Sequence, residues 1–371
     1  MGIGSTRIIG ELLAARAIKR TFVVVDPVLR HAPVFSALTR QLDQAGLSWT
    51  AFSDIEPDPG SDAVSTADAQ CQRIDAELVI AIGGGSSIDV AKAAAILATN
   101  RGRIHDYEGI EKFAKPPLPL IAIPTTAGTG SEVSGSCVIT DSQSGRKMSI
   151  RHARLNPASE AILDPTVLVS LPAHVAIHAG IDAFVHAFES FISRQANLIT
   201  DAINLQAIEL ISGNIRRFVA DRTDLEAGQR MLVGSCLAGM TFGQTGLGNV
   251  HCIARFIGAR YHLSHGLSNA LCLTHVARFN APAAQERYAK VAQAMGYDAQ
   301  PRPDKQAPEL AIKAIEQLCS DLQIPSRLRD AGIDVESLPS IAQDCFKADY
   351  SRWNPRQTSE SDFLRILQEG W

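Results

Sequence analysis

The sequence lacks paired cysteines, long apolar runs and a strong excess of either charge. Its seven cysteines are scattered singly, with no Cys-x-x-Cys pair, so a disulfide framework is not expected and a reducing compartment is favoured. No apolar run reaches the roughly 18 residues that span a bilayer. Arg7, Glu11 and Arg16 interrupt any signal-peptide core near the N-terminus. We therefore expect a soluble, cytoplasmic protein without a membrane partner.

The overall charge and composition exclude further classes of protein. The formal net charge is -4, so there is no basic field that would attract nucleic acid. A hydrophobic fraction of 46% and a charged fraction of 20% are typical of a globular protein with a sizeable core. The length of 371 residues suggests two domains at roughly 100–200 residues each.

Two kinds of sequence follow one another along the chain. In the first part, short β-branched runs alternate with helical stretches, which predicts an α/β domain with a parallel, Rossmann-like sheet. Beyond Leu171-Pro172, helical patterns dominate and predict an all-α domain. We place the boundary after residue 168, which gives domains 1–168 and 169–371, and we expect a surface loop at 301–303. The predicted strands are 21–26, 77–82 and 118–124, and the predicted helices are 5–18, 34–45, 63–73, 88–99, 181–193, 199–219, 228–240, 283–294, 308–322, 341–344 and 360–368.

A glycine-rich turn follows the second predicted strand. The run Gly83-Gly84-Gly85-Ser86-Ser87 leads directly into the predicted helix 88–99. Glycine lets the backbone approach a ligand without Cβ clashes, and the helix N-terminus offers free N–H groups to it. A pyrophosphate is the natural occupant, and a tight turn that binds nothing is the alternative. The turn matches neither the G-x-G-x-x-G nor the G-K-[ST] fingerprint.

A second polar loop and an aspartate support a dinucleotide ligand. The loop 124–132 follows a strand and offers three threonine hydroxyls, a serine and two glycines, although an ordinary capped loop would look the same. Open α/β sheets bind ligands at the carboxyl ends of their strands, where both loops stand. Asp26 ends the first strand and could accept from a ribose hydroxyl while repelling the 2′-phosphate of NADP. Because Pro27 follows it, Asp26 could equally be a turn residue.

Four side chains in the second half have the chemistry of a metal site. Asp182 and His186 are four residues apart in a predicted helix, which places them on one face. His251 and His265 follow, but fourteen residues of continuous helix would separate them by about 21 Å. Three imidazoles and a carboxylate suit iron(II) or zinc, whereas any one histidine alone is more often a core or surface residue. The four can share an ion only if the chain turns, and the positions that permit a break are Gly258 and 261–264.

Taken together, these motifs strongly resemble those of the iron-containing alcohol dehydrogenases, the group with a dehydroquinate-synthase-like fold. The resemblance runs along essentially the whole chain, in long motifs that occur in the right order. It implies an enzyme that moves a hydride between NAD(H) and a small primary alcohol or aldehyde, and that works as a homodimer. The motifs are GIGS, AIGGGSSIDVAKA, PTTAGTGSEV, AILDP, GIDAFVHAFESF, GLGNVH, HLSHG and NPRQTSESD.

The resemblance also assigns individual residues. Asp182, His186, His251 and His265 occupy the family's four metal-ligand positions for Fe2+, with Zn2+ as the alternative. The residues counted as catalytic are His251, His265 and Arg255. Asp26 matches the position where members that prefer NAD tend to carry an acid. The other candidates for cofactor contacts are Gly84, Gly85, Ser86, Asp89, Thr125, Thr126, Thr129 and Lys147. The substrate-pocket candidates are Ser136, Phe242, Leu247, Arg255, Tyr350 and Arg352.

One catalytic position departs from the family pattern. Family members often read His-x-x-x-His-Pro from the third ligand onward, but here Arg255 stands where the second histidine would be. Arginine stays charged near neutral pH, so proton transfer would go through solvent, His262 or a cofactor hydroxyl. We hypothesise that Arg255, with Arg352, anchors an aldehyde that carries an acid group, since a guanidinium binds such groups in a fork geometry. Alternatively, Arg255 pairs with a nearby acid or with cofactor phosphate.

Two other interpretations use the same motifs. A polyol dehydrogenase or a dehydroquinate-synthase-like lyase shares the fold, although the apolar Phe242 and Leu247 argue against the charged pocket that the lyase needs. A non-catalytic protein that binds NAD and metal is the alternative from another class, and the intact set of four ligands speaks against it. The chain begins at the Gly2-Ile3-Gly4 turn, where relatives usually have a preceding strand, so the dimer contacts of such a strand are not carried over.

Overall fold

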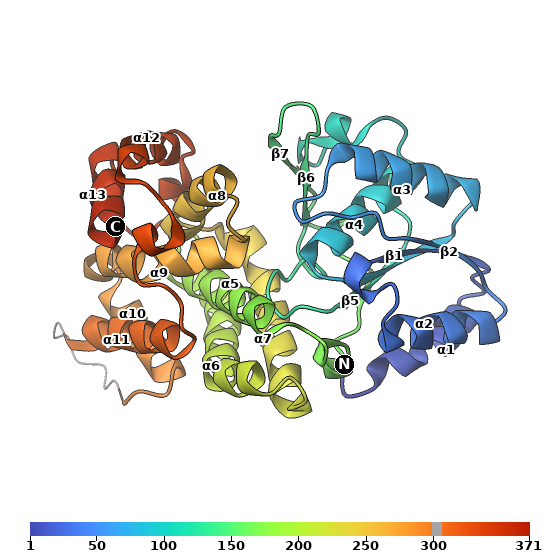
Figure 1. Cartoon of the computed structure of the whole chain (residues 1–371), viewed down its shortest axis with the longest axis horizontal. Coiled ribbons are helices and arrows are strands. Elements are labelled where there is room, and N and C mark those ends of the chain that lie inside the picture. Colours follow the sequence, from blue (N-terminus) through green and yellow to red (C-terminus); the bar gives the residue numbers. More distant parts are fainter. Residues whose placement is uncertain (299–305) are drawn as a thin grey trace. The chain divides into compact units, whose positions relative to one another are not determined.

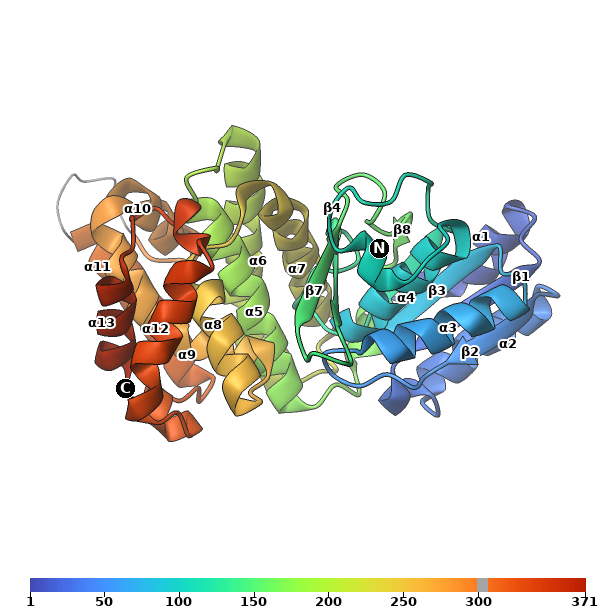
Figure 2. The same cartoon turned by 90° about the horizontal axis from the view of Figure 1, so that it is seen from above.

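The computed structural model describes residues 1–298 and 306–371, so the predicted loop at 301–303 lies outside the described residues. The chain forms two compact units, Met1–Leu171 and Pro172–Trp371. The predicted domain boundary, after residue 168, lies three residues before this division. Figures 1 and 2 show the elements of each unit.

The first unit contains a five-stranded, all-parallel sheet with the order β2-β1-β3-β5-β8. Its central strands are almost completely buried, because their apolar runs are covered on both faces. Helices α3 and α4 lie on one face, and α1 and α2 on the other (Figure 1). This confirms the predicted parallel α/β architecture. The bounds are β1 Arg20–Val25, β2 Ser48–Phe52, β3 Leu78–Gly83, β5 Leu120–Pro124, β8 Glu160–Ala161, α1 Ile9–Ala15, α2 Pro33–Gln44, α3 Ser61–Arg73 and α4 Gly85–Thr99.

A smaller, three-stranded sheet in this unit was not predicted. It has the order β4-β7-β6, and β6 and β7 form an antiparallel pair. Both strands alternate buried and exposed residues and contain polar or charged side chains, so they lack the apolar run that marks the central strands. The bounds are β4 Gly109–Ile110, β6 Ser136–Thr140 and β7 Lys147–Arg151.

The register of the large sheet aligns the carboxyl ends of three strands. The backbone N–H of Asp26, just after β1, donates to Ile82 O at 3.0 Å. The N–H of Thr125, just after β5, donates to Gly83 O at 3.0 Å. Asp26, the glycine turn and the threonine loop therefore stand side by side at one edge of the sheet.

The second unit is helical throughout its described residues. Helix α5 lies at its centre and packs against α6, α7 and α9, and from Gly180 to Ile192 every residue of α5 is buried. This confirms the predicted helical region. The bounds are α5 Ala173–Ile192, α6 Leu198–Ala220, α7 Leu225–Thr245, α8 Asn249–Tyr261, α9 His265–Asn280, α10 Gln285–Ala294, α11 Gln306–Asp321, α12 Leu338–Lys347 and α13 Glu360–Gly370.

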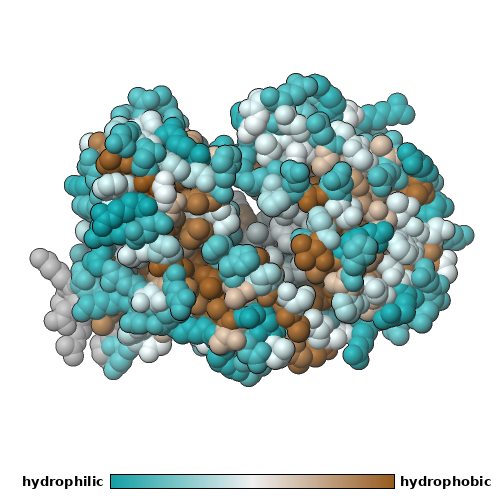
Figure 3. All heavy atoms as spheres, in the orientation of Figure 1, coloured by the Kyte–Doolittle hydropathy of each residue, from teal (hydrophilic) through white to brown (hydrophobic). Residues whose placement is uncertain are grey.

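Helix α5, Ala173–Ile192, is long and apolar enough by composition to cross a membrane, although polar residues interrupt it, and 78% of its apolar window is buried inside the structure. It also contains three buried polar side chains that belong to the site described below. These features are typical of the core helix of a globular domain. On the face shown in Figure 3, hydrophilic residues cover most of the surface and hydrophobic ones form small groups.

Candidate functional site

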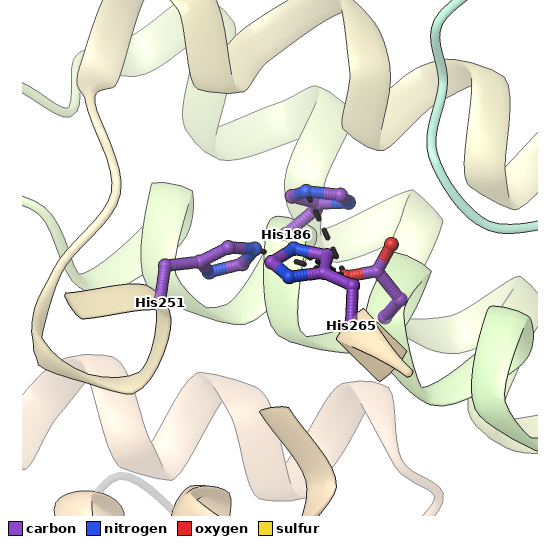
Figure 4. A group of neighbouring side chains, drawn as sticks. His186, His251 and His265 are labelled. Carbon is purple, nitrogen blue, oxygen red and sulfur yellow. Dashed lines mark ion pairs between the residues drawn. The ribbon is translucent and has the colours of Figure 1, made fainter. Parts of the chain in front are cut away.

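Four side chains of the second unit converge on one point. Asp182 and His186 lie on α5, His251 on α8, and His265 at the start of α9. One ligand atom of each lies within 4.8 Å of the other three. Asp182 Oδ1 is 3.9 Å from His186 Nε2, 3.7 Å from His251 Nε2 and 3.6 Å from His265 Nε2. Figure 4 shows the three imidazoles gathered around the carboxylate.

A sharp break between two helices brings His251 and His265 together. Helix α8 ends at Tyr261, His262 adopts a left-handed conformation with φ 53° and ψ 34°, and α9 begins at His265. Of the two breaks that the sequence allowed, the one at 261–264 is observed. No break occurs at Gly258, because α8 continues through that residue. The start of α9 also lies close to α5, since a Cβ on Gly266 would be 2.1 Å from His178 O.

Three of the four residues are buried and one is open. Asp182, His186 and His251 are 3%, 5% and 5% exposed, whereas the side chain of His265 is 47% exposed. Burial alone would raise the pKa of Asp182, but the surrounding histidines outweigh it and hold that pKa well below its usual range. The carboxylate is therefore ionised, and a small molecule could approach the group on the side of His265.

Glu189 orients His251. Its Oε2 is 2.8 Å from His251 Nδ1, and its Oε1 accepts from Val250 N at 2.7 Å. A carboxylate can only accept there, so Nδ1 carries a proton, and Nε2 is the ring atom that can ligate an ion. Burial alone would lower the pKa of His251, but Asp182 and Glu189 raise it to about 9, so an ion that binds Nε2 would displace a proton from it. Glu189 is not among the predicted site residues, although it follows His186 by three residues on the same helical face.

Asn269 was also missed, although it follows His265 by four residues on α9. It is fully buried. Its Nδ2 donates to Asp182 Oδ1 at 2.7 Å and lies 3.3 Å from His251 Nε2 and 3.2 Å from His265 Nε2. Helical spacing from the predicted ligands would have found both Glu189 and Asn269.

The group fits a divalent transition metal. One ionised carboxylate oxygen and the lone pairs of imidazoles point inward, and imidazole suits iron and zinc. A carboxylate behind a ligating histidine is the usual outer partner in such centres. The Oδ1 of Asn269, at the other end of the carboxamide from the Nδ2 that faces the centre, is buried and has no hydrogen-bond partner among the described residues.

The substrate-pocket candidates of the second unit take different places. Phe242 stacks on His186 with ring centroids 4.6 Å apart, and Leu247 is half-buried in the link between α7 and α8. Tyr350 packs edge-on against Trp353. Arg352 lies over the ring of Trp353 and is 3.6 Å from Asp349. These contacts place only Phe242 directly against a predicted metal ligand.

Arg255 lies one helical turn after His251 on α8, so the two leave the same face of the helix. Its side chain is exposed, and its guanidinium carbon is 6.0 Å from the ring centroid of Phe256. Within the described part of the chain it has no ion-pair partner, unlike Arg352. Pairing with a protein acid, one of the alternatives for Arg255, is therefore not observed.

The glycine turn of the first unit is packed closely by the neighbouring loop. A Cβ on Gly85 would be 2.8 Å from Thr129 Cγ2, and a Cβ on Gly84 would be 3.3 Å from Thr126 Oγ1. Helix α4, 15 residues long, has Gly84 as its N-cap and no side-chain cap. Its first N–H groups therefore remain available to an anion. Ser87 Oγ, buried in the first turn, also has no partner in the described residues, so the turn fits a phosphate.

The remaining cofactor candidates already have protein partners. Asp26 Oδ1 accepts from Val28 N at 2.9 Å, which is the turn role considered above. Asp89 accepts from Ser131 Oγ at 2.5 Å and from Val138 N at 2.9 Å, so it ties the threonine loop and β6 to α4. Lys147 Nζ pairs with Asp58 at 2.7 Å. Ser136, the pocket candidate of this unit, accepts from Lys92 Nζ through its carbonyl oxygen.

Comparisons with known proteins agree on one family. The model of the iron-containing alcohol dehydrogenases matches residues 1–165, and that of the C-terminal part of the Fe-containing alcohol dehydrogenase family matches residues 176–371. The chain is 34% identical to an NAD-dependent methanol dehydrogenase of Bacillus methanolicus, over 99% of this chain and 96% of that one. It is 35% identical to a sulfoacetaldehyde reductase of Bilophila wadsworthia, over 94% and 91%. A solved 1,3-propanediol oxidoreductase superposes with a TM-score of 0.96 at 36% identity, covering 100% and 97%.

Proposed function

We propose, from the premise that this chain belongs to the iron-containing alcohol dehydrogenase family, that it interconverts a small primary alcohol and its aldehyde with NAD(H) and a divalent metal. The observation that carries the proposal is the convergence of Asp182, His186, His251 and His265. A structural metal site would be closed on all sides, whereas the side chain of His265 is 47% exposed and leaves one side open. The family itself makes the chain an oxidoreductase.

The residues of the centre have separate tasks in this proposal. When bound there, Fe2+ or Zn2+ supplies Lewis acidity toward an alcohol or carbonyl oxygen. Asp182 contributes negative charge, and Glu189 keeps the proton on His251 Nδ1 so that Nε2 can ligate. Phe242 covers His186 and excludes water on that side. Because Arg255 stays charged, the alcohol proton leaves through solvent, the exposed His262 or a cofactor hydroxyl.

The first unit would hold the cofactor. NAD supplies the hydride acceptor when bound, and its pyrophosphate fits the uncapped N-terminus of α4 at Gly84, Gly85 and Ser86. Thr125, Thr126 and Thr129 offer hydroxyl or backbone groups to the same ligand. One oxygen of Asp26 caps its turn, which leaves the other for a ribose hydroxyl and favours NAD over NADP. Asp89 and Lys147 act here by holding the loop and the β-hairpin in place.

The substrate we propose is a short aldehyde that carries an acid group. Arg255 is exposed, lacks a protein partner in the described structure and leaves the same helical face as His251. A guanidinium in that position can bind a carboxylate, sulfonate or phosphonate. The relative from Bilophila wadsworthia is a sulfoacetaldehyde reductase, which supports this substrate class. Arg352 is a weaker second anchor because Asp349 already neutralises it.

A screen of substrates tests both levels of the proposal. The iron-loaded protein, kept anaerobic, is assayed with NADH against neutral and acidic short aldehydes. We expect NADH oxidation that depends on metal and on aldehyde, whereas a lyase or a binding protein would consume no NADH. Arg255→Leu should raise KM for acidic aldehydes much more than for neutral ones, and the control Arg260→Leu should alter neither. Equal effects of Arg255→Leu on both classes would remove the acid anchor but leave the oxidoreductase.

A homodimer in the cytoplasm completes the proposal. It rests on the family and not on any contact described above. Light scattering on the purified protein would give the mass in solution, and a mass of one chain would exclude the dimer.

A further inference from the structure

The carboxamide of Asn269 occupies an unusual position in the candidate centre. Asn269 is fully buried and lies one helical turn after His265. Its Nδ2 is within 3.3 Å of three of the atoms that would ligate a metal, namely Asp182 Oδ1, His251 Nε2 and His265 Nε2. A neutral amide donor thus meets the same lone pairs that a cation would use.

The two ends of this carboxamide are satisfied very differently. Nδ2 donates to Asp182 Oδ1 at 2.7 Å and lies close to two ring nitrogens, His251 Nε2 at 3.3 Å and His265 Nε2 at 3.2 Å. Oδ1, in contrast, is buried and has no hydrogen-bond partner among the described residues. An unpaired buried acceptor costs about 1–3 kcal/mol, so such an atom calls for an explanation.

A bound cation would reverse the preference between the two ends. It competes for the lone pairs that now accept from Nδ2, and the N–H dipoles would turn their positive ends toward it. Rotation about the Cβ–Cγ bond exchanges the positions of Nδ2 and Oδ1 without changing the shape of the side chain. The rotated carboxamide would direct an oxygen, the favourable end of the dipole, toward the cation.

We propose that Asn269 is a positioning residue whose carboxamide has two orientations coupled to metal occupancy. In one orientation Nδ2 donates to Asp182 Oδ1, and in the other, which a bound ion would favour, Oδ1 faces the ion. The inference rests on the metal binding of the proposed function but not on its substrate. An added neutral oxygen should also favour Fe2+ over Zn2+, because zinc prefers four ligands and oxygen donors suit harder ions.

The alternative is that Asn269 always donates to Asp182 and never turns. Asn269→Asp and the wild type together separate the two cases. If Oδ1 faces the ion, the variant places a charged oxygen there, and we expect the dissociation constants of Zn2+ and Co2+ to fall about tenfold, as outer partners of metal ligands typically change affinity by 10–100-fold. If Asn269 only donates, the charge of the variant still attracts the ion, so the case is decided by the orientation of the amide in a crystal structure of the zinc-loaded wild type at about 1.2 Å or better. Affinities are measured by competition with a chelator at pH 8, without any activity assay.

A control variant, a second substitution at Asn269 and the wild type itself complete this experiment. Asn204→Asp is the control, because Asn204 is equally buried on α6 and its amide oxygen accepts from Thr241; its metal affinity should not change. Asn269→Ala should lower the preference for Fe2+ over Zn2+. Circular dichroism shows whether each variant folds. Should Asn269→Asp fail to fold, the amide of the zinc-loaded wild type decides the question in a crystal structure at about 1.2 Å or better.

The orientation of the amide gives the deciding outcome. Oδ1 toward the zinc in the wild type, together with tighter metal binding by Asn269→Asp, supports the inference. Unchanged or weaker binding, or Nδ2 toward the zinc, overturns it while the proposed function stands. If the wild type binds no divalent ion at all, the proposed function itself fails.

Discussion

The two candidate sites are built by different means. The cofactor turn uses backbone groups that follow one another along the chain, at the ends of adjacent parallel strands. The metal centre uses side chains from three helices, and its members are spread over more than eighty residues from Asp182 to His265. A site made of backbone tolerates changes of side chain but not of volume. A site made of side chains depends on the identity of each one.

The strongest test of this difference is the removal of one metal ligand. His251→Ala removes one of the three imidazoles around Asp182, so the protein should bind less metal, as measured by elemental analysis. The loss of several kcal/mol of Lewis-acid stabilisation corresponds to a fall in kcat of roughly 10^3-fold. The affinity for NADH should not change. His174→Ala removes an exposed histidine of the same helix α5 and serves as the control. Full metal content in His251→Ala would contradict the assignment.

The reciprocal change adds a single carbon to the backbone site. In Gly85→Ala the new Cβ would meet Thr129 at 2.8 Å. Overpacking of about 1–3 kcal/mol should weaken NADH binding by roughly 10–100-fold, as measured by fluorescence titration, with metal content unchanged. In the second unit, Gly213→Ala adds the same atom where nothing lies within 4 Å. If both variants bind NADH like the wild type, the turn is not the pyrophosphate site.

How much of each site the sequence could reveal follows from the same difference. Gly83–Ser87 is a local motif, and its place after a buried strand was predictable from one stretch of chain. The helical pair Asp182 and His186 was predictable for the same reason. That His251 and His265 join them depends on the turn at His262, whose left-handed backbone no local rule fixes. The family resemblance, and not spacing, selected these four.

Other features were missed because their signal is weak or lies elsewhere in the fold. Strands β6 and β7 are half-exposed and polar, so they lack an apolar run. The partners of Asp89 and Lys147 come from distant segments, at Val138 and Asp58. Glu189 and Asn269, however, keep helical spacing from predicted ligands, and a search for such spacing would have found them.

A milder test of the side-chain site changes an outer partner. Glu189→Gln keeps the size of the side chain but weakens the acceptor that fixes the His251 tautomer. Metal affinity should fall by roughly 10–100-fold, measured by chelator competition. Glu226→Gln, on the exposed surface of α7, should leave it unchanged. An unaltered affinity in Glu189→Gln would mean that Glu189 only stabilises the fold.

The smallest expected effect concerns the stability of the first unit. Asp164 is fully buried and accepts from Gly4 N, Thr6 N and Thr166 N at 2.9–3.0 Å. Burial alone would raise the pKa of Asp164, but the bonds from Thr6 and Thr166 hold it below its usual value. Asp164→Asn should lower the free energy of unfolding by about 1–3 kcal/mol, measured with urea.

The pH dependence of this difference has a definite sign. Because the folded-state pKa of Asp164 lies below the unfolded one, its contribution is fully present above roughly pH 4, the unfolded value. It is lost as the pH falls through the folded pKa. The difference in the free energy of unfolding between wild type and Asp164→Asn should therefore be constant from pH 6 to 8 and become smaller below pH 4. A difference that becomes larger in acid would contradict this account. The metal affinity should be the same in both proteins.

The convergence of four side chains on one ion is tested most directly by anomalous diffraction from crystals of the metal-loaded protein. Data collected at the absorption edge of the bound metal should give one strong peak per chain, in contact with Asp182, His186, His251 and His265. A peak bound elsewhere, or no peak in a fully loaded protein, would contradict the central claim.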